Sequence, residues 1–303
     1  MQALRSELAT LIQQFTRGDG LYESPIPGVH CVRYSHTDRR TKRQWRACVA
    51  IVAQGAKEIV LGGEVYLCDE LHYTAAPVHL PVISRIASAS PHRPFLALLI
   101  DLDAAILSEV GSQLEQVEVP LSKNPIRAFF KGTASDAMVE ASVRLTKLFM
   151  KRDDARVVGP LVVKEIFFHL LKGPEGNAIW QFTRSGSIMQ KMSQAIFKIR
   201  FDLHNEVNVA ALAKAAGMSR SAFFQHFKDV TSMSPIQYQK RLRLLEARRL
   251  LIETDDTAEG SAFKVGYKSA SQFSREYSRM FGLSPVRDAT TLKKLGPSAF
   301  QSE

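Results

Sequence analysis

GYKSASQFSREYSRMFGLSP, residues Gly266–Pro285, predicts a short helix with two unlike faces. Ser269 is a suitable N-cap, because its hydroxyl can accept a hydrogen bond from a free amide of the first helical turn. Phe273, Tyr277 and Phe281 then recur every four residues and form one apolar stripe, while the other face carries hydrogen-bond donors. Such a helix suits the major groove of DNA, although an ordinary amphipathic surface helix has the same pattern.

The chain contains this pattern twice. The earlier copy is GMSRSAFFQHFKDVTSMSP (Gly217–Pro235), which repeats the capping serine, the aromatic spacing and the final Ser-Pro. Each copy follows a helix of small residues and a glycine turn, VAALAKAAG (209–217) and TAEGSAFKVG (257–266). A helix, a turn containing glycine and a capped second helix are typical of a helix-turn-helix. The repeat therefore predicts two such units, at about residues 208–235 and 257–285.

These motifs resemble the DNA-binding domain of the AraC/XylS family of bacterial transcription regulators, over roughly the last hundred residues. The matching positions are Gly217, Ser219, Phe227, Pro235, Gly266, Tyr267, Ser269, Phe273, Ser274, Arg275, Phe281, Gly282, Ser284 and Pro285. The resemblance implies two units joined by one long helix, expected over Ser234–Glu253, that bind adjacent major-groove segments of double-stranded promoter DNA. Gly260 departs from the pattern and costs roughly 1 kcal/mol against Ala in a helix, so the second unit is expected to be softer.

The resemblance also implies which side chains meet base edges and phosphates. The expected DNA-binding residues are Arg220, Ser221, Phe224 and Gln225 in the first unit and Ser271, Gln272, Ser274, Arg275 and Arg279 in the second. Phe223, Phe227, Phe273 and Tyr277 are expected in the core. Phe224 is unusual on such a face, where it could touch a thymine methyl group or instead be buried.

The long connecting helix carries four arginines: Arg241, Arg243, Arg248 and Arg249. Solvation is the simplest explanation for them, although some could reach phosphates.

Charge is unevenly distributed along the 303 residues, a length that suits two domains. Residues 186–303 hold 18 Lys and Arg against 11 Asp and Glu, a balance of +7, and the first 185 residues hold 22 against 19, a balance of +3. A basic surplus beside the helix-turn-helix units is what phosphate binding requires. An acidic protein partner or a membrane surface would also fit this charge.

The first half of the chain has the periodicity of strands from Val29 onward. The expected strands are 47–53, 57–61, 64–68, 71–75, 80–88 and 95–102, with a hairpin turn at Gly62-Gly63. Two helices, 135–150 and 157–171, follow, and the best linker is Lys172–Asn177. This order resembles the cupin-like N-terminal domain of a subgroup of AraC-type regulators, which implies a sensor that binds a small molecule inside a barrel.

We therefore expect a multidomain α+β protein. A cupin-like antiparallel β-barrel with flanking helices occupies residues 1–175, and an all-α DNA-binding domain occupies 186–303, beginning with a helix over 188–205 that Ser187 could cap.

Two further sets of residues are candidates for effector binding and for a homodimer contact. Aromatic and polarizable side chains suit a small-molecule pocket, although an ordinary core is as good an explanation: Trp45, Cys48, Tyr66, Cys68 and Tyr73. A narrow 3-4-3 stripe suits pairing of two helices, although the helix could simply cover the barrel: Met138, Ala141, Leu145 and Leu148.

Catalysis, metal and cofactor are not expected. The three cysteines are odd in number and lack a Cys-x-x-Cys pair, which indicates a reducing cytoplasm. No His-x-His pair, Gly-rich phosphate loop or Gly-x-Ser-x-Gly elbow is present, and no signal peptide or membrane-spanning run is recognised.

The expected function is that of a cytoplasmic transcription regulator, with RNA polymerase as a partner if it activates. A cupin enzyme with a DNA-binding tail and an architectural protein without a ligand remain alternatives.

Overall fold

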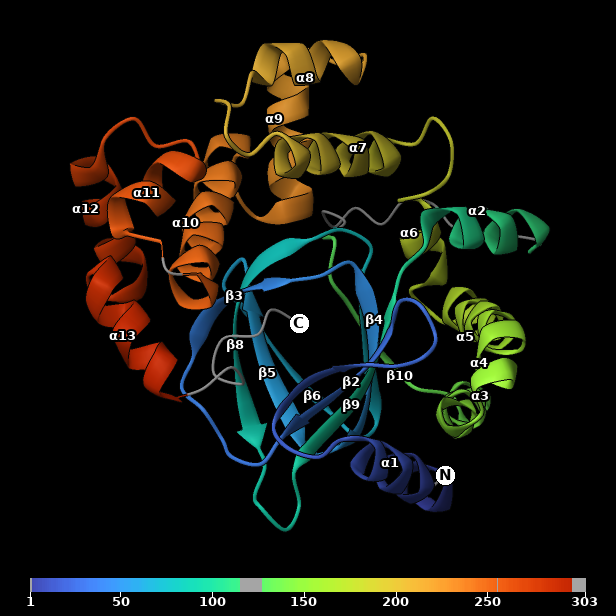
Figure 1. The fold of residues 1–303 in the computed structure, drawn as a ribbon. Coiled ribbons are helices and arrows are strands. Elements are labelled where there is room, and N and C mark those ends of the chain that lie inside the picture. The colour runs from blue at the N-terminus through green and yellow to red at the C-terminus, as the bar shows by residue number, and fades with distance from the viewer. Residues whose placement is uncertain (1, 115–126, 255, 296–303) are drawn as a thin grey trace.

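The computed structural model describes residues 2–114, 127–254 and 256–295, and residues 115–126 and 296–303 of the two predicted domains lie outside the described residues. A sheet-rich N-terminal part is followed by a helical C-terminal part that lies across one end of the sheets (Figure 1). The predicted organisation, an antiparallel sheet domain followed by an all-helical domain, is confirmed.

Two antiparallel sheets form the N-terminal part, with strand orders β1-β2-β9-β4-β7-β10 and β3-β8-β5-β6. The strands are β1 (Gly20–Glu23), β2 (Val29–Tyr34), β3 (Thr41–Trp45), β4 (Cys48–Gln54), β5 (Ala56–Leu61), β6 (Glu64–Asp69), β7 (His72–Ala76), β8 (Leu80–Ser88), β9 (Phe95–Asp101) and β10 (Phe130–Thr133). Apolar side chains from both sheets meet in a shared core, since Val32, Ala50 and Leu99 of one sheet face Trp45 and Ile59 of the other.

The six predicted strands correspond to β4–β9, and the hairpin at Gly62-Gly63 is confirmed. The two glycines have φ of 60° and 86° and connect β5 to β6 with Leu61 opposite Glu64. Positive φ at both positions matches a type I′ turn, which glycine adopts without steric cost. The sequence did not single out β3, because its half-buried polar residues give no alternation, or β10, a short edge strand that pairs with β7 from far along the chain.

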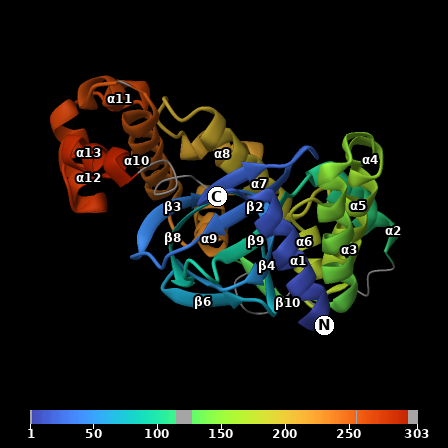
Figure 2. The same ribbon diagram turned by 60° about the horizontal axis from the view of Figure 1, so that its bottom comes forward.

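Helices cover one side of the sheets: α1 (Gln2–Phe15), α2 (Ala104–Gln113), α3 (Asp136–Lys147), α4 (Arg152–Val157), α5 (Gly159–Lys172) and α6 (Gly176–Trp180). Helix α3 lies between α1 and α5, as Figure 2 shows.

The predicted dimer stripe lies on α3 and is not exposed. Met138, Ala141 and Leu145 are buried within the protomer, and Leu148 is partly buried in a 3-10 turn (Leu148–Met150) after the helix. The spacing matches a seam for a second chain, but α1 and α5 of the same chain fill the space beside it. The prediction that these four residues form a dimer interface is therefore wrong.

The C-terminal part consists of α7 (Ile188–Phe201), α8 (Val209–Ala215), α9 (Arg220–Thr231), α10 (Pro235–Glu253), α11 (Ala258–Lys264), α12 (Ala270–Phe281) and α13 (Pro285–Leu295). Helices α8 and α9 form the first helix-turn-helix unit, α11 and α12 the second, and α10 connects them (Figure 1). Ser187 caps α7 as expected, but the helix ends at Phe201 rather than residue 205.

Among the described residues, hydrogen bonds join the two parts at three places. The hydroxyl of Tyr238 in α10 donates to the carbonyl of His79 over 2.7 Å. The ammonium of Lys42 in β3 donates to the carbonyl of Met280 in α12, and the amide of Ala128 donates to the carbonyl of Val230 in α9. The sheet domain thus contacts α9, α10 and α12.

The burial of α3 yields a stability prediction. Leu145→Ala should lower the free energy of unfolding by about 2–5 kcal/mol, because Leu145 is 0% exposed and its removal leaves a cavity. Leu71→Ala is the control, since Leu71 is 51% exposed and should change stability by about 0.5 kcal/mol or less. Urea unfolding followed by circular dichroism measures both variants, and equal stabilities would contradict this packing.

Candidate nucleic-acid interface

Helices α9 and α12 begin in the same way. The hydroxyl of Ser219 accepts a hydrogen bond from the amide of Ala222 (3.2 Å), and that of Ser269 accepts one from the amide of Gln272 (3.3 Å). Both capping interactions satisfy a first-turn amide that has no partner within the helix.

The two helices also end in the same way. Each closes with a residue in the left-handed region, Ser232 with φ 61° in the first unit and Gly282 with φ 81° in the second. The next helix then starts at once, and Ser234 forms a full capping box with Gln237. Local sequence thus defines both ends of each helix.

Buried aromatic rings determine which face each helix presents to solvent. Phe223, Phe227, Phe273 and Tyr277 are fully buried, as predicted. The ring of Phe227 packs edge-on against Tyr238 of α10 at 5.5 Å between centroids. With these rings in the core, the opposite faces of α9 and α12 are accessible to a partner.

The predicted DNA-binding residues lie on those opposite faces. Eight are exposed, namely Arg220, Ser221, Phe224, Gln225, Ser271, Gln272, Arg275 and Arg279, and Ser274 is half-buried. Phe224 is 41% exposed, so it belongs to the surface rather than to the core. The structure brings the α9 residues together on one helix face and the α12 residues on another.

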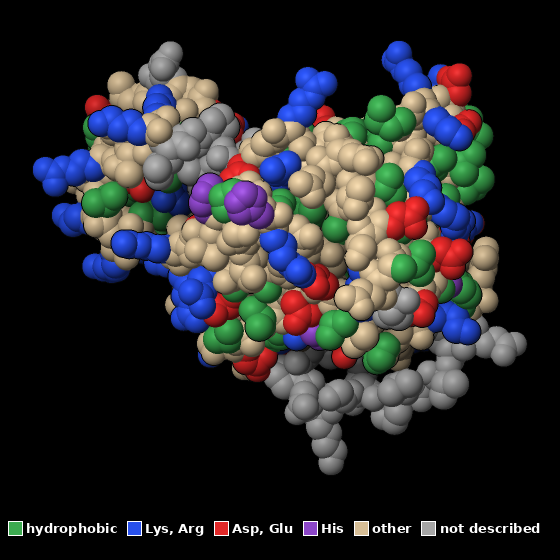
Figure 3. Space-filling model, turned by 90° about the horizontal axis from the view of Figure 1, so that it is seen from below, with side chains coloured by type: hydrophobic (Ala, Val, Ile, Leu, Met, Phe, Trp, Pro, Cys, Tyr) green, Lys and Arg blue, Asp and Glu red, His purple; other side chains and the backbone are tan. Residues whose placement is uncertain are grey.

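Three of these side chains are cations without an intramolecular partner. Within the described residues, Arg220, Arg275 and Arg279 make no hydrogen bond or ion pair, whereas Gln225 donates to Asp229 (2.8 Å). Gln272 similarly donates to Glu276 (3.4 Å). Lys and Arg side chains also project from the left edge of the face in Figure 3, on the side of α11–α13. Unpaired guanidinium groups can bind phosphate or guanine without first breaking an ion pair.

Gln239 attaches helix α10 to the connection before α8, at the entrance of the first unit. The amide of Gln239 donates to the carbonyl of Asn205 (2.6 Å), and its oxygen accepts from the amide of Val207 (3.1 Å). Gln239 is buried, so both bonds lie away from solvent.

Arg243, one turn further along α10, contacts both units. Its guanidinium donates to the carbonyls of Leu203 (2.8 Å), His204 (2.8 Å) and Asn205 (3.0 Å) before the first unit, and to that of Gly266 (3.1 Å) in the turn of the second. A Cβ on Gly266 would lie 2.1 Å from the His204 carbonyl, and its φ is 90°. Glycine is thus required for this approach. The interpretation of Arg243 as a solvated side chain is wrong.

Arg248 is also structural. It makes two hydrogen bonds to Asp288 of α13 (2.8 and 3.1 Å), and the same carboxylate accepts from the hydroxyl of Tyr277 (2.8 Å). Its guanidinium carbon lies 4.4 Å from the centre of the Phe281 ring. Asp288 is buried, so this cluster joins α10, α12 and α13 inside the second unit. The interpretation of Arg248 as a solvated or phosphate-binding side chain is therefore wrong.

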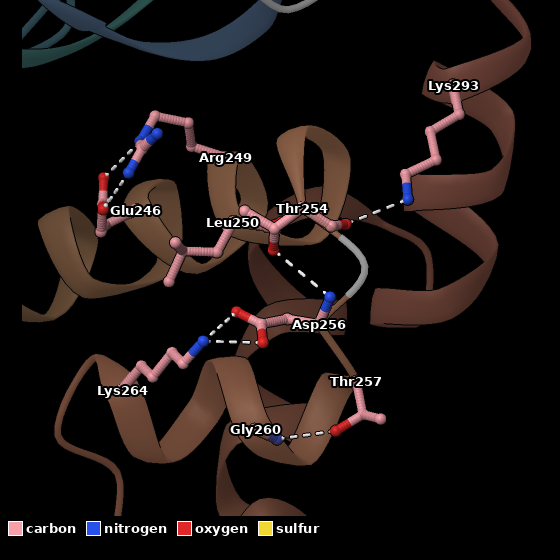
Figure 4. A network of polar contacts seen from close by, with 9 residues as sticks. All are labelled: Glu246, Arg249, Leu250, Thr254, Asp256, Thr257, Gly260, Lys264 and Lys293. Atoms are coloured by element: carbon pink, nitrogen blue, oxygen red, sulfur yellow. Dashed lines mark hydrogen bonds and ion pairs between the residues drawn. The ribbon is translucent and has the colours of Figure 1, made fainter.

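The remaining two arginines of α10 are exposed. Arg249 is paired with Glu246 and Glu253 of its own helix, and Figure 4 shows its guanidinium directed toward Glu246. Arg241 is exposed as well, so the solvated interpretation suits these two positions.

Polar contacts anchor the start of α11, also seen in Figure 4. The ammonium of Lys264 contacts both carboxylate oxygens of Asp256 (2.7 and 2.6 Å), a contact that lowers the pKa of that carboxyl. The hydroxyl of Thr257 caps the amide of Gly260 (2.9 Å). Gly260 thus lies in the first turn of α11, beside the cap, rather than in a helix interior.

Four of the candidate effector residues, Trp45, Cys48, Cys68 and Tyr73, are buried, and Tyr66 is partly buried. A cavity of about 10 Å³, close to the volume that one water needs, is lined by Trp45, Cys68 and Lys57 among others. Cys48, Tyr66 and Tyr73 do not line it. Lys57 is buried, which lowers the pKa of its ammonium, and its nitrogen lies 4.9 Å from the centre of the Trp45 ring. The volume of this cavity is far below that of typical ligand pockets.

Cys31, Cys48 and Cys68 are free and buried, and burial raises the pKa of each thiol to about 12. Within residues 2–114, 127–254 and 256–295, no group of three or more His, Cys, Asp or Glu side chains is placed to hold a metal ion. Among those same residues, no helix combines the length and apolar character needed to cross a bilayer.

Two family models match the chain. That of the AraC-type transcriptional regulator N-terminus matches residues 25–178, and that of a helix-turn-helix domain matches residues 212–288. Together they span most of both parts of the structure.

Related proteins agree with these matches. The chain is 26% identical over 158 residues to the HTH-type transcriptional regulator ArgR of Pseudomonas aeruginosa, covering 52% of this chain and 47% of that protein. It is 26% identical over 204 residues to the HTH-type transcriptional regulator ExsA of the same species, covering 67% and 69%. The chain thus spans about half the length of the first of these relatives.

A solved structure shares the two-part fold. The crystal structure of an apo ToxT variant from Vibrio cholerae superposes with a TM-score of 0.57 at 12% identity, covering 91% of this chain and all of that one. At this identity the likeness concerns the fold alone.

The contacts of Arg243 can be tested by substitution. Arg243→Ala should lower the free energy of unfolding by at least about 1.5–3 kcal/mol, the contribution of one hydrogen bond to a charged group, because four carbonyls lose their donor. Hydrogen exchange should become faster in residues 203–207 and at Gly266. Arg249→Ala, with surface ion pairs only, should cost about 0.5 kcal/mol or less. Unchanged exchange in both segments of the Arg243 variant would refute the joining role.

Proposed function

The chain belongs to the AraC-type family of transcriptional regulators, and we propose that it is a sequence-specific DNA-binding regulator that inserts α9 and α12 into successive segments of the major groove. The observation that carries this proposal is the pair of equally capped helices, each with a buried aromatic face and an exposed polar face. Their connection through Arg243 supports a constant spacing between the two reading faces.

Arg275 is our main candidate for reading a base. It is exposed and unpaired within the described residues, on the face of α12 opposite the buried Phe273 and Tyr277. A guanidinium in that position can make two hydrogen bonds to guanine, which discriminate by about 1–3 kcal/mol. Arg220, Arg279 and the serines are the proposed phosphate and base contacts beside it. Gln225 and Gln272 would first exchange their contacts to Asp229 and Glu276 for contacts to DNA.

Regulation is proposed to act through binding alone, without catalysis, in the cytoplasm. A small molecule would bind the N-terminal part, and RNA polymerase would be the partner at promoters that the protein activates. The three sheet-domain contacts to α9, α10 and α12 support coupling between such a ligand and the DNA-binding helices.

A homodimer is part of this proposal. Its contact surface lies on α4 and α5, and not on the α3 stripe predicted from the sequence. Apolar side chains are exposed along α4 and α5: Val157 (65%), Leu161 (64%) and Phe168. Their spacing of four and seven residues places them on one side of consecutive helical turns, the pattern of a helix-pairing face. We propose that a second copy of the chain covers this surface.

The reading role of Arg275 gives a binding prediction. Arg275→Ala should weaken binding to the selected DNA site by roughly ten- to a hundredfold at constant salt, and leave folding intact because the side chain is exposed. Fluorescence anisotropy on the site and on random DNA measures the effect. A base contact predicts a larger loss on the site, whereas a phosphate contact predicts equal losses and a salt slope reduced by about one.

Arg152→Ala, which removes an exposed cation from α4, controls for the change in net charge. The proposal of two reading helices fails if Gln225→Ala combined with Arg275→Ala binds the selected site as tightly as the parent while folding normally.

The dimer surface gives a separate prediction. Leu161→Asp should convert the protein to a folded monomer, because a carboxylate would be buried without a partner at the apolar contact. Sedimentation velocity measures the mass, and Val65→Asp, an exposed apolar position on β6, should leave it unchanged. A dimer that persists in the Leu161 variant would place the interface elsewhere.

A further inference from the structure

A pocket of about 450 Å³ lies between the sheet domain and α7, outside the space between the sheets. One wall is formed by Pro77, Val78 and His79 in the connection from β7 to β8, and the other by α7. In Figure 1, α7 crosses above that end of the sheets. The volume is within the range of about 300–1,000 Å³ found for small-molecule sites.

A single unpaired cation lies in this pocket. Arg200 on α7 is half-buried, and among the described residues no carboxylate or other group forms an ion pair or hydrogen bond with its guanidinium. Burial is the main cause of its lowered pKa. The other arginine near this end of the sheets, Arg46, is paired with Asp101 over 2.8 Å. A partly dehydrated guanidinium without a counter-ion is unfavourable, so an anion that pairs with it would be stabilised.

Ser193 and His79 are among the neutral polar residues that line the same space. The hydroxyl of Ser193, two turns before Arg200 on α7, is buried and has no hydrogen-bond partner in the described structure. The pKa of His79 is lowered to about 3, mainly by burial and then by Arg200 and Arg46, so its imidazole is neutral near pH 7. The pocket therefore offers one positive charge together with neutral hydrogen-bonding groups, and Thr183, Gln190 and Gln194 add to the latter.

The rest of the lining is largely apolar. Val78, Ile196 and Phe182 contribute buried surface, and Phe197 contributes a ring that is 65% exposed although it lies at the pocket. An exposed aromatic ring beside a cation is suited to cover the apolar part of a ligand.

We propose that this pocket binds a small monocarboxylate with an apolar body, with the carboxylate on Arg200 and Ser193 and the apolar body against Val78, Ile196 and Phe197. The inference deepens the proposed function, on which it rests, by locating the effector between the two parts instead of between the sheets. A ligand there contacts the β7–β8 connection and α7 at once. Because α7 packs against α9 and α10, and Tyr238 of α10 bonds to the His79 carbonyl, binding would bias the position of the DNA-binding helices.

The test uses the full chain and two acids, octanoate and 4-phenylbutyrate, each with its uncharged amide. Isothermal titration calorimetry should detect both acids, and each amide should bind at least about tenfold more weakly, the loss expected for one charge-assisted hydrogen bond. Arg200→Gln should reduce acid binding by a similar factor without lowering the melting temperature, since it removes an unpaired half-buried charge. Lys198→Gln, an exposed cation on the same helix, should bind as the parent does.

A second variant guards against effects of charge alone. Ala104 is exposed at the pocket, so Ala104→Phe should fill it and abolish binding of both acids in a normally folded protein. Binding of neither acid at millimolar concentration would overturn the proposal, as would equal affinity of acid and amide or undiminished binding by Arg200→Gln. Because DNA binding of the parent without acid is measured separately, failure here is distinguishable from failure of the proposed function.

Discussion

The hydrogen bonds from the Arg243 guanidinium to four backbone carbonyls determine how the two helix-turn-helix units lie relative to each other. Three carbonyls belong to residues 203–205 and the fourth to Gly266, so one side chain of α10 connects the entrance of the first unit to the turn of the second. Gln239 holds the same entrance from the preceding helical turn. Separating the charged guanidinium from these carbonyls would cost free energy, because the carbonyls are partly shielded from water. The arrangement therefore resists independent movement of the two units.

A second cluster performs the corresponding task inside the second unit. Arg248, Asp288 and Tyr277 bring together α10, α13 and α12 around one buried carboxylate. The desolvation of that carboxylate is offset by two hydrogen bonds from the guanidinium and one from the phenol. Helix α12 is thereby positioned by a polar contact as well as by its aromatic stripe. Its opposite face is not needed for this packing and is available to bind DNA.

The location of the proposed effector pocket follows from how the space between the sheets is filled. Side chains as large as Trp45 and Phe95 occupy the space between the sheets and leave about 10 Å³. The junction with α7 holds about 450 Å³, lined by the connecting residues 77–79 on one side and by α7 on the other. A ligand at the junction touches both parts of the protein directly, whereas one between the sheets would act on the DNA-binding helices only through intervening strands.

Local features of the fold could be predicted because each depends on residues within about one helical turn or one hairpin of each other. The serine caps, the aromatic spacing, Gly282 and the glycine hairpin are of this kind, and the exposed faces of α9 and α12 follow from them. The sequence does not reveal the roles of Arg243 and Arg248, because their partners lie 23 to 40 residues away in the chain. A short sequence pattern does not distinguish a solvated arginine from a buried one. The α3 stripe was misassigned for the same reason: an apolar face requires a covering surface, and only the packed structure shows that α1 and α5 of the same chain provide it. Pocket volume likewise depends on the gap left after all side chains have packed, a quantity that no short sequence pattern contains.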